Sequence, residues 1–328
     1  MATIKDVAKE AGVSVATVSR VLNKDHAVTA KTAAKVKAAI KKLDYSPNML
    51  GNNLRKSQTK NILVLVPTLS NQFYSKILRG MELEAAKEQY NILICMMDDK
   101  RDTEEKYLSL LKTKLADGAV FLSSTLDGRE MTNLSRHYPV VQCGEHVTGS
   151  NTPFVSIDNE KAGYDATLAL IHGGHRNIAF VGSNQNTVSS EERKKGYFRA
   201  LLEFHLPIRE ENIILDSYSF KSGMRCALRL IGKDDRPTAV FAVADSIAIG
   251  LMRGLHDAGY RVPQDMAVIG CDDIAVASFF YPALSTISQP QFELGKYAVR
   301  LLLERIQEGL AVNRRIILKH SLIFRETI

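Results

Sequence analysis

Five neighbouring side chains near the N-terminus have the chemistry needed to read DNA. They are Val15, Ala16, Thr17, Ser19 and Arg20. Short side chains let a helix approach base edges closely, and an arginine can reach a phosphate or the edge of a guanine. These side chains can act together only if one exposed helix face carries them, so the elements around them must be predicted next.

The other reactive side chains do not form a catalytic or metal-binding pattern. The chain has no Gly-x-Gly-x-x-Gly after a strand, no phosphate loop, no Gly-x-Ser-x-Gly and no His-Glu-x-x-His. Neighbouring carboxylates, as in Asp98-Asp99 and Asp272-Asp273, diverge on a regular element, which disfavours shared acid–base work. His172 and His175 lack Cys or carboxylate neighbours, so a polar helix end is favoured over a metal site. We therefore expect no enzyme, no catalytic residue, no metal and no cofactor.

Apolar spacing predicts two short helices around the DNA-reading residues. Ile4, Val7, Ala8 and Ala11 recur at i, i+3, i+4 and i+7, with Thr3 and Asp6 as cap and first-turn acid. A left-handed Gly12 would end this helix, and Ser14 would cap the second, whose inward residues are Val18, Val21 and Leu22. Two short helices joined by a tight Gly-containing turn are typical of a helix-turn-helix, although an ordinary small bundle would give the same pattern.

A third helix and a linker follow. Ala33, Val36, Ala39, Ile40 and Leu43 predict a helix over about 30–43, which would complete a small shared core. Pro47 disfavours helix in the residue before it, so residues 44–60 are expected to be a linker, in which 49–56 could form a short helix. A plain flexible linker is the alternative.

Charge and composition separate this segment from the rest of the chain. Residues 1–60 hold 12 Lys/Arg and 4 Asp/Glu, whereas the whole 328-residue chain has a net charge of +7. A basic segment on a nearly neutral body is expected of a nucleic-acid-binding protein, the alternative being a solvated tail or a binder of anionic surfaces. There is no apolar run near about 18 residues and no secretory h-region, and Cys95, Cys143, Cys226 and Cys271 lack metal-type spacing. We expect a cytoplasmic protein with reduced thiols and no membrane partner.

From residue 61 onward, apolar runs alternate with helical patterns. Such repeated βα units predict parallel sheets with right-handed crossovers, and two sets of units predict two lobes. The predicted strands are 62–67, 92–96, 119–122, 140–142, 178–181, 213–215, 239–242 and 267–270, with two more near 316–318 and 322–324. The predicted helices are about 73–89, 103–115, 160–172, 190–204, 221–231, 246–258 and 291–308.

The segment from Ile4 to Asn23 closely resembles the DNA-binding signature of the LacI/GalR family of bacterial transcription regulators. The resemblance extends over essentially the whole chain. It implies an all-α helix-turn-helix headpiece and an α/β two-lobe core like that of periplasmic binding proteins, with parallel sheets and three crossover strands. The implied domains are residues 1–46 (headpiece), 47–60 (hinge helix or linker) and 61–328 (core). Lobe 1 would be about 61–159 and 290–320, and lobe 2 about 160–289 and 321–328.

The resemblance also implies which residues contact double-stranded operator DNA. His26 could touch DNA or be only a turn residue. The equivalent of Leu54 wedges into the minor groove in family members, one from each subunit of a homodimer. Gly51 and Asn52 depart from the family's Ala and Arg, which should weaken the hinge helix without DNA. The expected DNA-contacting residues are Thr3, Ser14, Val15, Ala16, Thr17, Ser19, Arg20, Asn23, His26, Asn48 and Leu54.

Contacts to a small-molecule effector are expected at the C-terminal ends of strands, where open parallel sheets bind ligands. Phe73 or Tyr74 would lie against a sugar or base ring, unless both are core aromatics, and Arg193 would pair with ligand hydroxyls or a carboxylate, unless it is a surface residue. The expected effector-binding residues, the later ones by their match to family motifs, are Asn71, Phe73, Tyr74, Arg193, Tyr218, Asp245 and Asp272.

The resulting hypothesis is a homodimeric DNA-binding regulator, most readily a repressor, controlled by a sugar, a sugar derivative or a nucleoside. Three alternatives are a stand-alone small-molecule binding protein, an α/β dehydrogenase, and a regulator that answers to a partner protein. An activator would have the same sequence features as a repressor.

Overall fold

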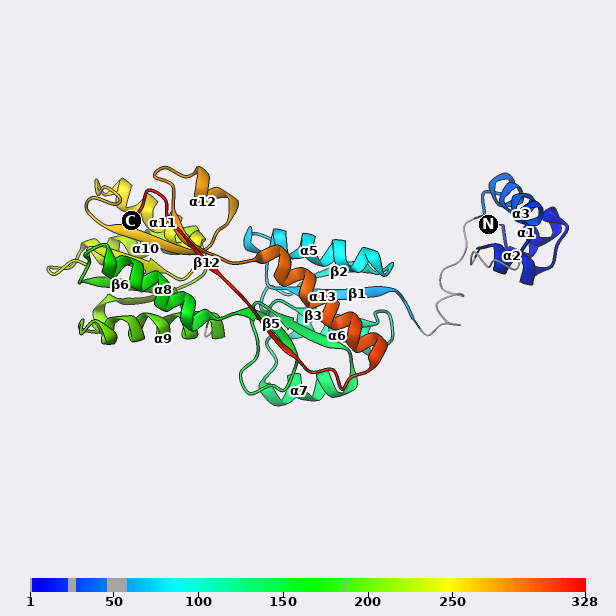
Figure 1. The fold of residues 1–328 in the computed structure, drawn as a ribbon, viewed down its shortest axis with the longest axis horizontal. Coiled ribbons are helices and arrows are strands. Elements are labelled where there is room, and N and C mark those ends of the chain that lie inside the picture. Colours follow the sequence, from blue (N-terminus) through cyan, green and yellow to red (C-terminus); the bar gives the residue numbers. More distant parts are fainter. Residues whose placement is uncertain (1, 23–27, 46–57, 186) are drawn as a thin grey trace. The chain divides into compact units, whose positions relative to one another are not determined.

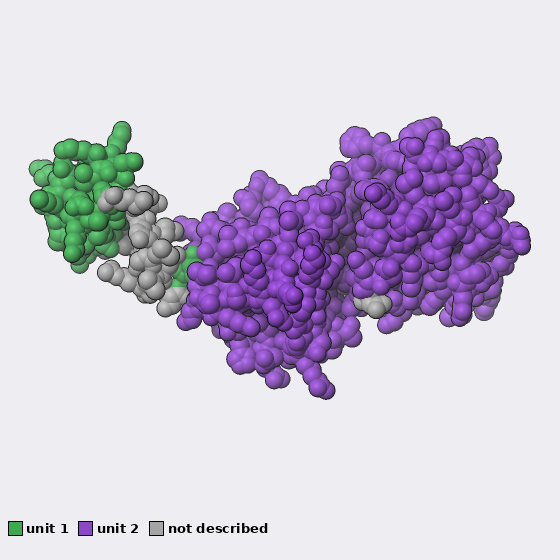
Figure 2. Space-filling model, turned by 180° about the vertical axis from the view of Figure 1, so that it is seen from behind, with its two compact units in different colours: residues 1–59 green, residues 60–328 purple. Residues whose placement is uncertain are grey.

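The computed structural model describes residues 2–22, 28–45, 58–185 and 187–328. The chain separates into two compact units, residues 1–59 and residues 60–328, which Figure 2 colours separately. None of the described helices combines the length and the apolar character needed to cross a membrane.

The first unit contains three helices, α1 (Ile4–Ala11), α2 (Val15–Leu22) and α3 (Ala30–Lys42). Their buried apolar side chains form one small core, made of Val7, Ala8, Ala11, Val18, Val36 and Ala39. Three predicted helices are therefore confirmed, with their inward faces as the apolar spacing indicated. Tyr45, which the sequence places in the linker, packs against this core from its edge.

The helix ends follow local side-chain chemistry. Thr3 and Asp6 form a capping box at the start of α1, with the Asp6 N–H donating to Thr3 Oγ1 at 3.4 Å and the Thr3 N–H donating to Asp6 Oδ2 at 2.8 Å. Gly12 ends the helix with φ 66°, a left-handed conformation. The Thr17 N–H donates to Ser14 Oγ at 3.1 Å, so Ser14 caps α2 as predicted.

The second unit is built on two six-stranded sheets (Figure 1). The first sheet has the order β11-β5-β4-β3-β1-β2, and each of its described pairings is parallel. Its strands are β1 (Asn61–Val66), β2 (Asn91–Met96), β3 (Gly118–Phe121), β4 (Val140–Cys143), β5 (Phe154–Ile157) and β11 (Arg315–Leu318). We call this sheet and its helices lobe 1.

The second sheet has the order β12-β10-β9-β8-β6-β7 and belongs to lobe 2. Its pairings are parallel except that β12 runs antiparallel to β10. Its strands are β6 (Ile178–Ser183), β7 (Ile213–Asp216), β8 (Ala239–Ala242), β9 (Ala267–Asp272), β10 (Ser285–Ser288) and β12 (Ser321–Ile323). The chain passes between the sheets after β5, after β10 and between β11 and β12, which gives the three predicted crossover segments.

Helices cover both faces of each sheet. Lobe 1 contains α5 (Phe73–Lys87), α6 (Arg101–Lys112), α7 (Gly128–His137) and, from late in the chain, α13 (Gln291–Glu308). Lobe 2 contains α8 (Asn159–His172), α9 (Val188–Glu203), α10 (Phe220–Ile231), α11 (Asp245–Asp257) and the short α12 (Ala275–Phe279). Strand β1 shows why its sequence is a continuous apolar run: Ile62 and Val64 face the core under α5 and α13, whereas Leu63 and Leu65 face the core under α6 and α7.

Two strands and two α-helices are absent from the sequence prediction, namely β5, β10, α7 and α12. Strand β10 reads Ser-Thr-Ile-Ser and has no apolar run, because its burial comes from its neighbours β9 and β12. Helix α7 has only two buried apolar side chains, Met131 and Leu134, on an otherwise polar sequence. Its beginning is instead marked by a local signal, a capping box between Asp127 and Glu130.

Candidate functional site

The outward face of α2 carries the residues that the sequence predicts to contact DNA. Val15, Ala16 and Arg20 are exposed, and Val15 exposes 41% of its surface, whereas Val18 is fully buried on the opposite face. Thr17 and Ser19 are half-buried at the margin of this face. The α2 face therefore presents two short apolar side chains and one cation to solvent, which suits close approach to base edges and to a phosphate.

The other predicted DNA contacts either take part in helix caps or lie outside the described residues. Ser14 and Thr3 are exposed, but both hydroxyls are engaged in helix caps, and Ser14 Oγ also lies 2.9 Å from Thr17 Oγ1. The predictions for Asn23, His26, Asn48 and Leu54 lie outside the described residues. The wedge expected from the hinge segment is thus an expectation from the sequence alone.

A cavity of about 580 Å³ lies between the two lobes of the second unit. Its lining comes from segments that follow β1, β2, β3 and β4 in lobe 1 and β6, β7 and β9 in lobe 2. These are the C-terminal ends of parallel strands, where such sheets bind ligands. Six of the seven predicted effector contacts line it, namely Asn71, Phe73, Tyr74, Arg193, Tyr218 and Asp272.

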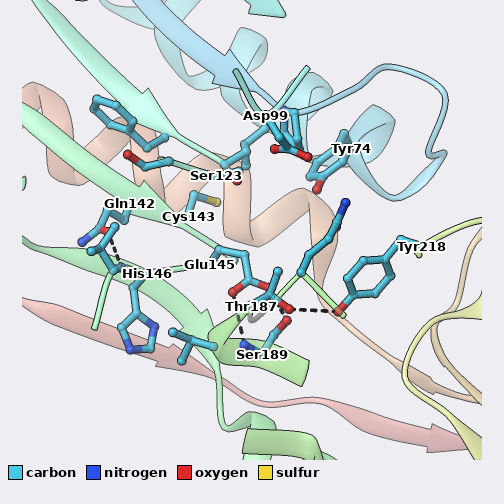
Figure 3. A pocket seen from close by; sticks show the side chains of 18 of the residues that line it. Tyr74, Asp99, Ser123, Gln142, Cys143, Glu145, His146, Thr187, Ser189 and Tyr218 are labelled. Atoms are coloured by element: carbon cyan, nitrogen blue, oxygen red, sulfur yellow. Dashed lines mark hydrogen bonds between the residues drawn. The ribbon is translucent and has the colours of Figure 1, made fainter. Parts of the chain in front are cut away.

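Two aromatic side chains enter the cavity from the start of α5. Asn71 Oδ1 accepts the Phe73 N–H at 3.0 Å, which orients the first turn of this helix. The Phe73 and Tyr74 rings meet edge to face with centroids 5.4 Å apart. Burial, with Glu145 nearby, holds the pKa of Tyr74 well above its usual range, so its hydroxyl stays protonated and can donate a hydrogen bond. Figure 3 shows Tyr74 next to Asp99 on the lobe 1 side of the cavity.

Arg193 reaches the cavity from α9 and is held by the protein itself. Its Nε donates to Asn159 Oδ1 at 3.0 Å, and its Nη1 donates to the Val243 carbonyl oxygen at 2.6 Å. Only 4% of the residue is exposed. Gly196 explains how α9 comes so close to α8, because a Cβ there would lie 2.0 Å from the Glu160 carbonyl oxygen. Arg193 and Gly196, three positions apart on α9, thus combine a cation at the cavity with the close packing that places it.

Asp272 closes the lobe 2 side of the cavity at the end of β9. Its Oδ1 accepts from Gln289 Nε2 at 2.8 Å, and its carbonyl oxygen accepts from Gln291 Nε2 at 2.5 Å. Its φ of 133° is unusual for a residue with a side chain, and these two glutamine contacts secure it. Burial raises the pKa of Asp272 well above its usual range, although Arg193 opposes the rise. A raised pKa favours the protonated carboxyl group, which can donate a hydrogen bond to a ligand as well as accept one.

Asp245 does not line the cavity, and the expectation that it contacts a ligand is corrected. The residue is fully buried at the start of α11, where Oδ1 accepts from Thr286 Oγ1 at 2.6 Å and Oδ2 accepts from the Ile274 N–H at 2.9 Å. Gly270 makes room for it, since a Cβ there would lie 2.3 Å from Asp245 Oδ1. Asp245 therefore holds the segment that follows Asp272 and the neighbouring strand β10 in place.

Sequence reasoning missed Glu145, which also lines the cavity. It follows β4, and its carboxylate accepts the Ser189 N–H at 3.1 Å and the Ser189 hydroxyl. Burial raises the pKa of Glu145, while the bonds from Ser189 oppose the rise. The rule that places ligand contacts after strands applied to this position, so a signal was present in the sequence. Asp99, which also lines the cavity, was considered only as half of a carboxylate pair.

The two histidines singled out by the sequence lie away from this cavity. The His175 ring nitrogen Nδ1 lies 2.9 Å from Thr238 Oγ1, and the His172 ring packs edge-on against Phe204. Among the residues that the structure describes, no cluster of three or more His, Cys, Asp or Glu could hold a metal ion.

Comparison with known proteins relates both units to characterised families. Residues 3–48 match the family described as bacterial regulatory proteins, lacI family, and residues 167–328 match the periplasmic binding protein-like domain. The chain is 38% identical over 330 residues to the HTH-type transcriptional regulator RegA of Clostridium saccharobutylicum, covering 100% of this chain and 99% of RegA. It is 36% identical over 327 residues to catabolite control protein A of Priestia megaterium, covering 99% of this chain and 98% of that protein.

Solved structures show the same architecture. The lac repressor dimer bound to operator and an anti-inducer superposes with a TM-score of 0.89 at 27% identity, covering 99% of this chain and 98% of that one. A CelR–cellobiose complex gives 0.76 at 30% identity with 100% of both chains covered. A regulator from Enterococcus faecium with bound ribose gives 0.73 at 30% identity, covering 81% of this chain and 98% of that one.

Proposed function

The chain belongs to the LacI family of bacterial regulatory proteins, and on that premise we propose that it is a homodimeric transcriptional repressor whose operator affinity depends on a small molecule. The observation that supports this most directly is the pairing, in one chain, of an exposed DNA-reading helix face with a cavity lined by polar and aromatic side chains. Because its target is the bacterial chromosome, we place its action in the cytoplasm.

The headpiece would read DNA through α2. Val15, Ala16 and Thr17 lie in its first turn, which is the part of a recognition helix that meets base edges. Two headpieces of a dimer would occupy major grooves one helical turn apart, about 34–36 Å. Leu54 and its counterpart in the second subunit would then open the minor groove between them.

Contacts within the second unit connect the cavity to the crossover segments. Arg193 bonds to Asn159, which directly follows the first crossover, and Asp272 bonds to Gln289 and Gln291 in the second. A ligand that pulls on Arg193 or Asp272 therefore acts on the segments about which the lobes turn. If the two lobe orientations position the hinge segments differently, ligand and operator affinities become linked by a coupling free energy.

Exposed apolar side chains are consistent with a second copy of the chain as partner. Phe220, Met224 and Leu228 form an exposed stripe at i, i+4 and i+8 along α10. The edge strand β2 exposes Leu93, Ile94 and Met96. Exposed apolar surface of this kind marks protein interfaces, and we assign both surfaces to the homodimer.

We infer that the effector is a sugar, a sugar derivative or a nucleoside. Aromatic faces at Phe73, Tyr74 and Tyr218 can cover a ring, while Arg193 and Asp272 can bind its hydroxyls. Two structures of similar fold hold sugars, cellobiose in one and ribose in the other. Neither sugar is thereby assigned to this protein.

The test begins with a duplex that the full-length protein selects from a random DNA pool. We expect a two-fold symmetric sequence, and operator affinity measured by fluorescence anisotropy should change when a stabilising sugar or nucleoside is added. Leu54→Ala should weaken operator binding while leaving the ligand-induced rise in unfolding temperature unchanged. Ligand binding without any DNA preference would instead indicate a stand-alone binding protein and overturn the proposal.

A further inference from the structure

Lobe 1 and lobe 2 are joined across the cavity by a carboxylate. Glu145, which follows β4 in lobe 1, accepts the Ser189 N–H at 3.1 Å and the Ser189 hydroxyl in lobe 2. Ser189 lies in the first turn of α9, a helix of 16 residues. Figure 3 shows the Glu145 carboxylate pointing at Ser189 across the cavity.

Glu145 replaces the cap that α9 would normally obtain from its own sequence. Thr187 occupies the N-cap position, but among the described residues its side chain makes no capping hydrogen bond. Its hydroxyl lies instead 3.1 Å from the Tyr218 hydroxyl. The backbone N–H groups at the start of a helix attract anions, and here a carboxylate from the opposite lobe already meets them.

Among the described residues that line the cavity, the one other positive group is partly engaged by the protein. Arg193 is the one Lys or Arg side chain among the described residues that line it, and its Nε and Nη1 are bonded to Asn159 and Val243. Three acidic side chains line the same space, those of Asp99, Glu145 and Asp272. His146 adds no positive charge, because burial, with Arg315 nearby, lowers its pKa.

We propose that Glu145 makes this cavity select an uncharged, hydroxyl-rich ligand and reject the phosphorylated form of the same molecule. The inference rests on the proposed function, in which the cavity holds the effector. Carboxyl oxygens accept hydrogen bonds from ligand hydroxyls, whereas a phosphate would have to displace Glu145 from the first turn of α9. Glu145 is thus a specificity-determining residue of the cavity.

Inorganic phosphate is the smallest probe of this idea. Isothermal titration calorimetry of the full-length protein, with chloride keeping the ionic strength constant, compares wild type with Glu145→Ala, Glu145→Gln and Asp99→Asn. Freeing the start of α9 should strengthen phosphate binding by about tenfold or more in Glu145→Ala, and by less in Glu145→Gln. Asp99→Asn removes one negative charge from the same cavity without freeing a helix end, so it should gain much less.

Two results would overturn the inference. One is a wild type that binds phosphate as tightly as Glu145→Ala, and the other is an equal gain in Asp99→Asn, which would reduce the effect to overall charge. Far-ultraviolet circular dichroism verifies that each variant is folded. If Glu145→Ala does not fold, Glu145→Gln is the deciding variant, because its amide retains an acceptor for Ser189 and removes the acidic group. Phosphate affinity no higher than that of the wild type in Glu145→Gln would then overturn the inference.

Matched sugars provide a second measurement. Ribose and ribose 5-phosphate, and glucose and glucose 6-phosphate, are compared by the rise in unfolding temperature of the wild type. In each pair we expect the uncharged member to stabilise the protein more. A larger rise in unfolding temperature with a phosphorylated member would overturn this inference but not the proposed function, because operator selection by the same protein is measured separately. Failure to select any DNA sequence would overturn the proposed function and leave the phosphate comparison in force.

Discussion

Arg193, Asp272 and Asp245 are three charged residues that the structure uses in different ways. Arg193 and Asp272 each keep part of their hydrogen-bonding capacity for the cavity and commit the rest to the protein. Asp245 commits both carboxylate oxygens to the protein and is fully buried. The charge of a side chain alone therefore does not identify a ligand contact. What identifies it is whether the protein leaves some of its hydrogen-bonding groups free to face the cavity.

Asp245→Ala should destabilise the protein more than it affects ligand binding. The change leaves the Ile274 N–H and the Thr286 hydroxyl without their acceptor, which costs about 1–3 kcal/mol in the free energy of unfolding. Urea denaturation followed by circular dichroism measures this cost. Asp272→Ala should show the reverse pattern, with a larger loss of ligand affinity. A greater affinity loss in Asp245→Ala would restore Asp245 as a direct contact.

Arg20→Ala should weaken DNA binding through a phosphate contact. Arg20 is exposed at the last turn of α2, where its guanidinium can meet the DNA backbone. Affinity for selected and random duplexes should fall together, and the slope of log K against log salt should drop by about 1. Lys37→Ala, an equal charge change on the exposed face of α3, is the control. A loss confined to the selected sequence would assign Arg20 to a base instead.

At the scale of elements, glycine positions set how closely helices pack beside the cavity. Gly163 on α8 and Gly196 on α9 each face the backbone of the other helix. A Cβ at Gly163 would lie 2.1 Å from the Arg193 carbonyl oxygen, and a Cβ at Gly196 would lie 2.0 Å from the Glu160 carbonyl oxygen. This approach brings Arg193 against the start of α8, within reach of Asn159. Local helix propensity favours alanine at such sites, so tertiary packing explains the glycines.

Gly196→Ala should therefore destabilise lobe 2 despite alanine's better helix propensity. The new methyl group would force α8 and α9 apart, at a cost of about 1–3 kcal/mol in the free energy of unfolding. The affinity for a stabilising ligand should fall too, because Arg193 moves with α9. Gly232→Ala is a matched control, since its Cβ would have its nearest neighbour at 3.4 Å. Equal stabilities of the two variants would refute this account.

At the scale of the whole molecule, sequence-specific binding to operator DNA depends on dimerisation. One small headpiece makes few DNA contacts, and two joined headpieces bind together with a much higher effective concentration. The apolar stripe of α10 and the edge strand β2 are the surfaces we assign to this association. Burying them in a second copy would remove exposed side chains such as Leu228 and Ile94 from water.

Leu228→Asp should accordingly produce a monomer. Leu228 exposes 61% of its surface on α10, and an aspartate there would place like charges across a two-fold interface. Light scattering coupled to size-exclusion chromatography measures the mass, and fluorescence anisotropy should show a large loss of operator affinity. Leu202→Asp, on α9, is equally exposed at 61% and should remain dimeric. A Leu228→Asp dimer of unchanged affinity would move the interface elsewhere.

Elements whose signals are local could be predicted from the amino-acid order. The helices of the headpiece follow from apolar spacing, from the caps at Thr3 and Ser14 and from Gly12, because each signal acts within one or two turns of chain. Buried parallel strands such as β1 and β6 are also local, since both faces must be apolar. The polar strand β10 and the polar helix α7 escaped prediction because their burial depends on neighbours that are distant in sequence.

The set of side chains that meet in the cavity depends on how the chain folds in three dimensions. Glu145 bonds to Ser189 across 44 positions of sequence, and Arg193 bonds to Val243 across 50. Spacing along a chain carries no information about such meetings, because crossover segments and helix packing bring strand ends together. The same packing turned Asp245 inward to the Ile274 N–H and left Asp272 facing the cavity, although both lie near the C-terminal end of a strand.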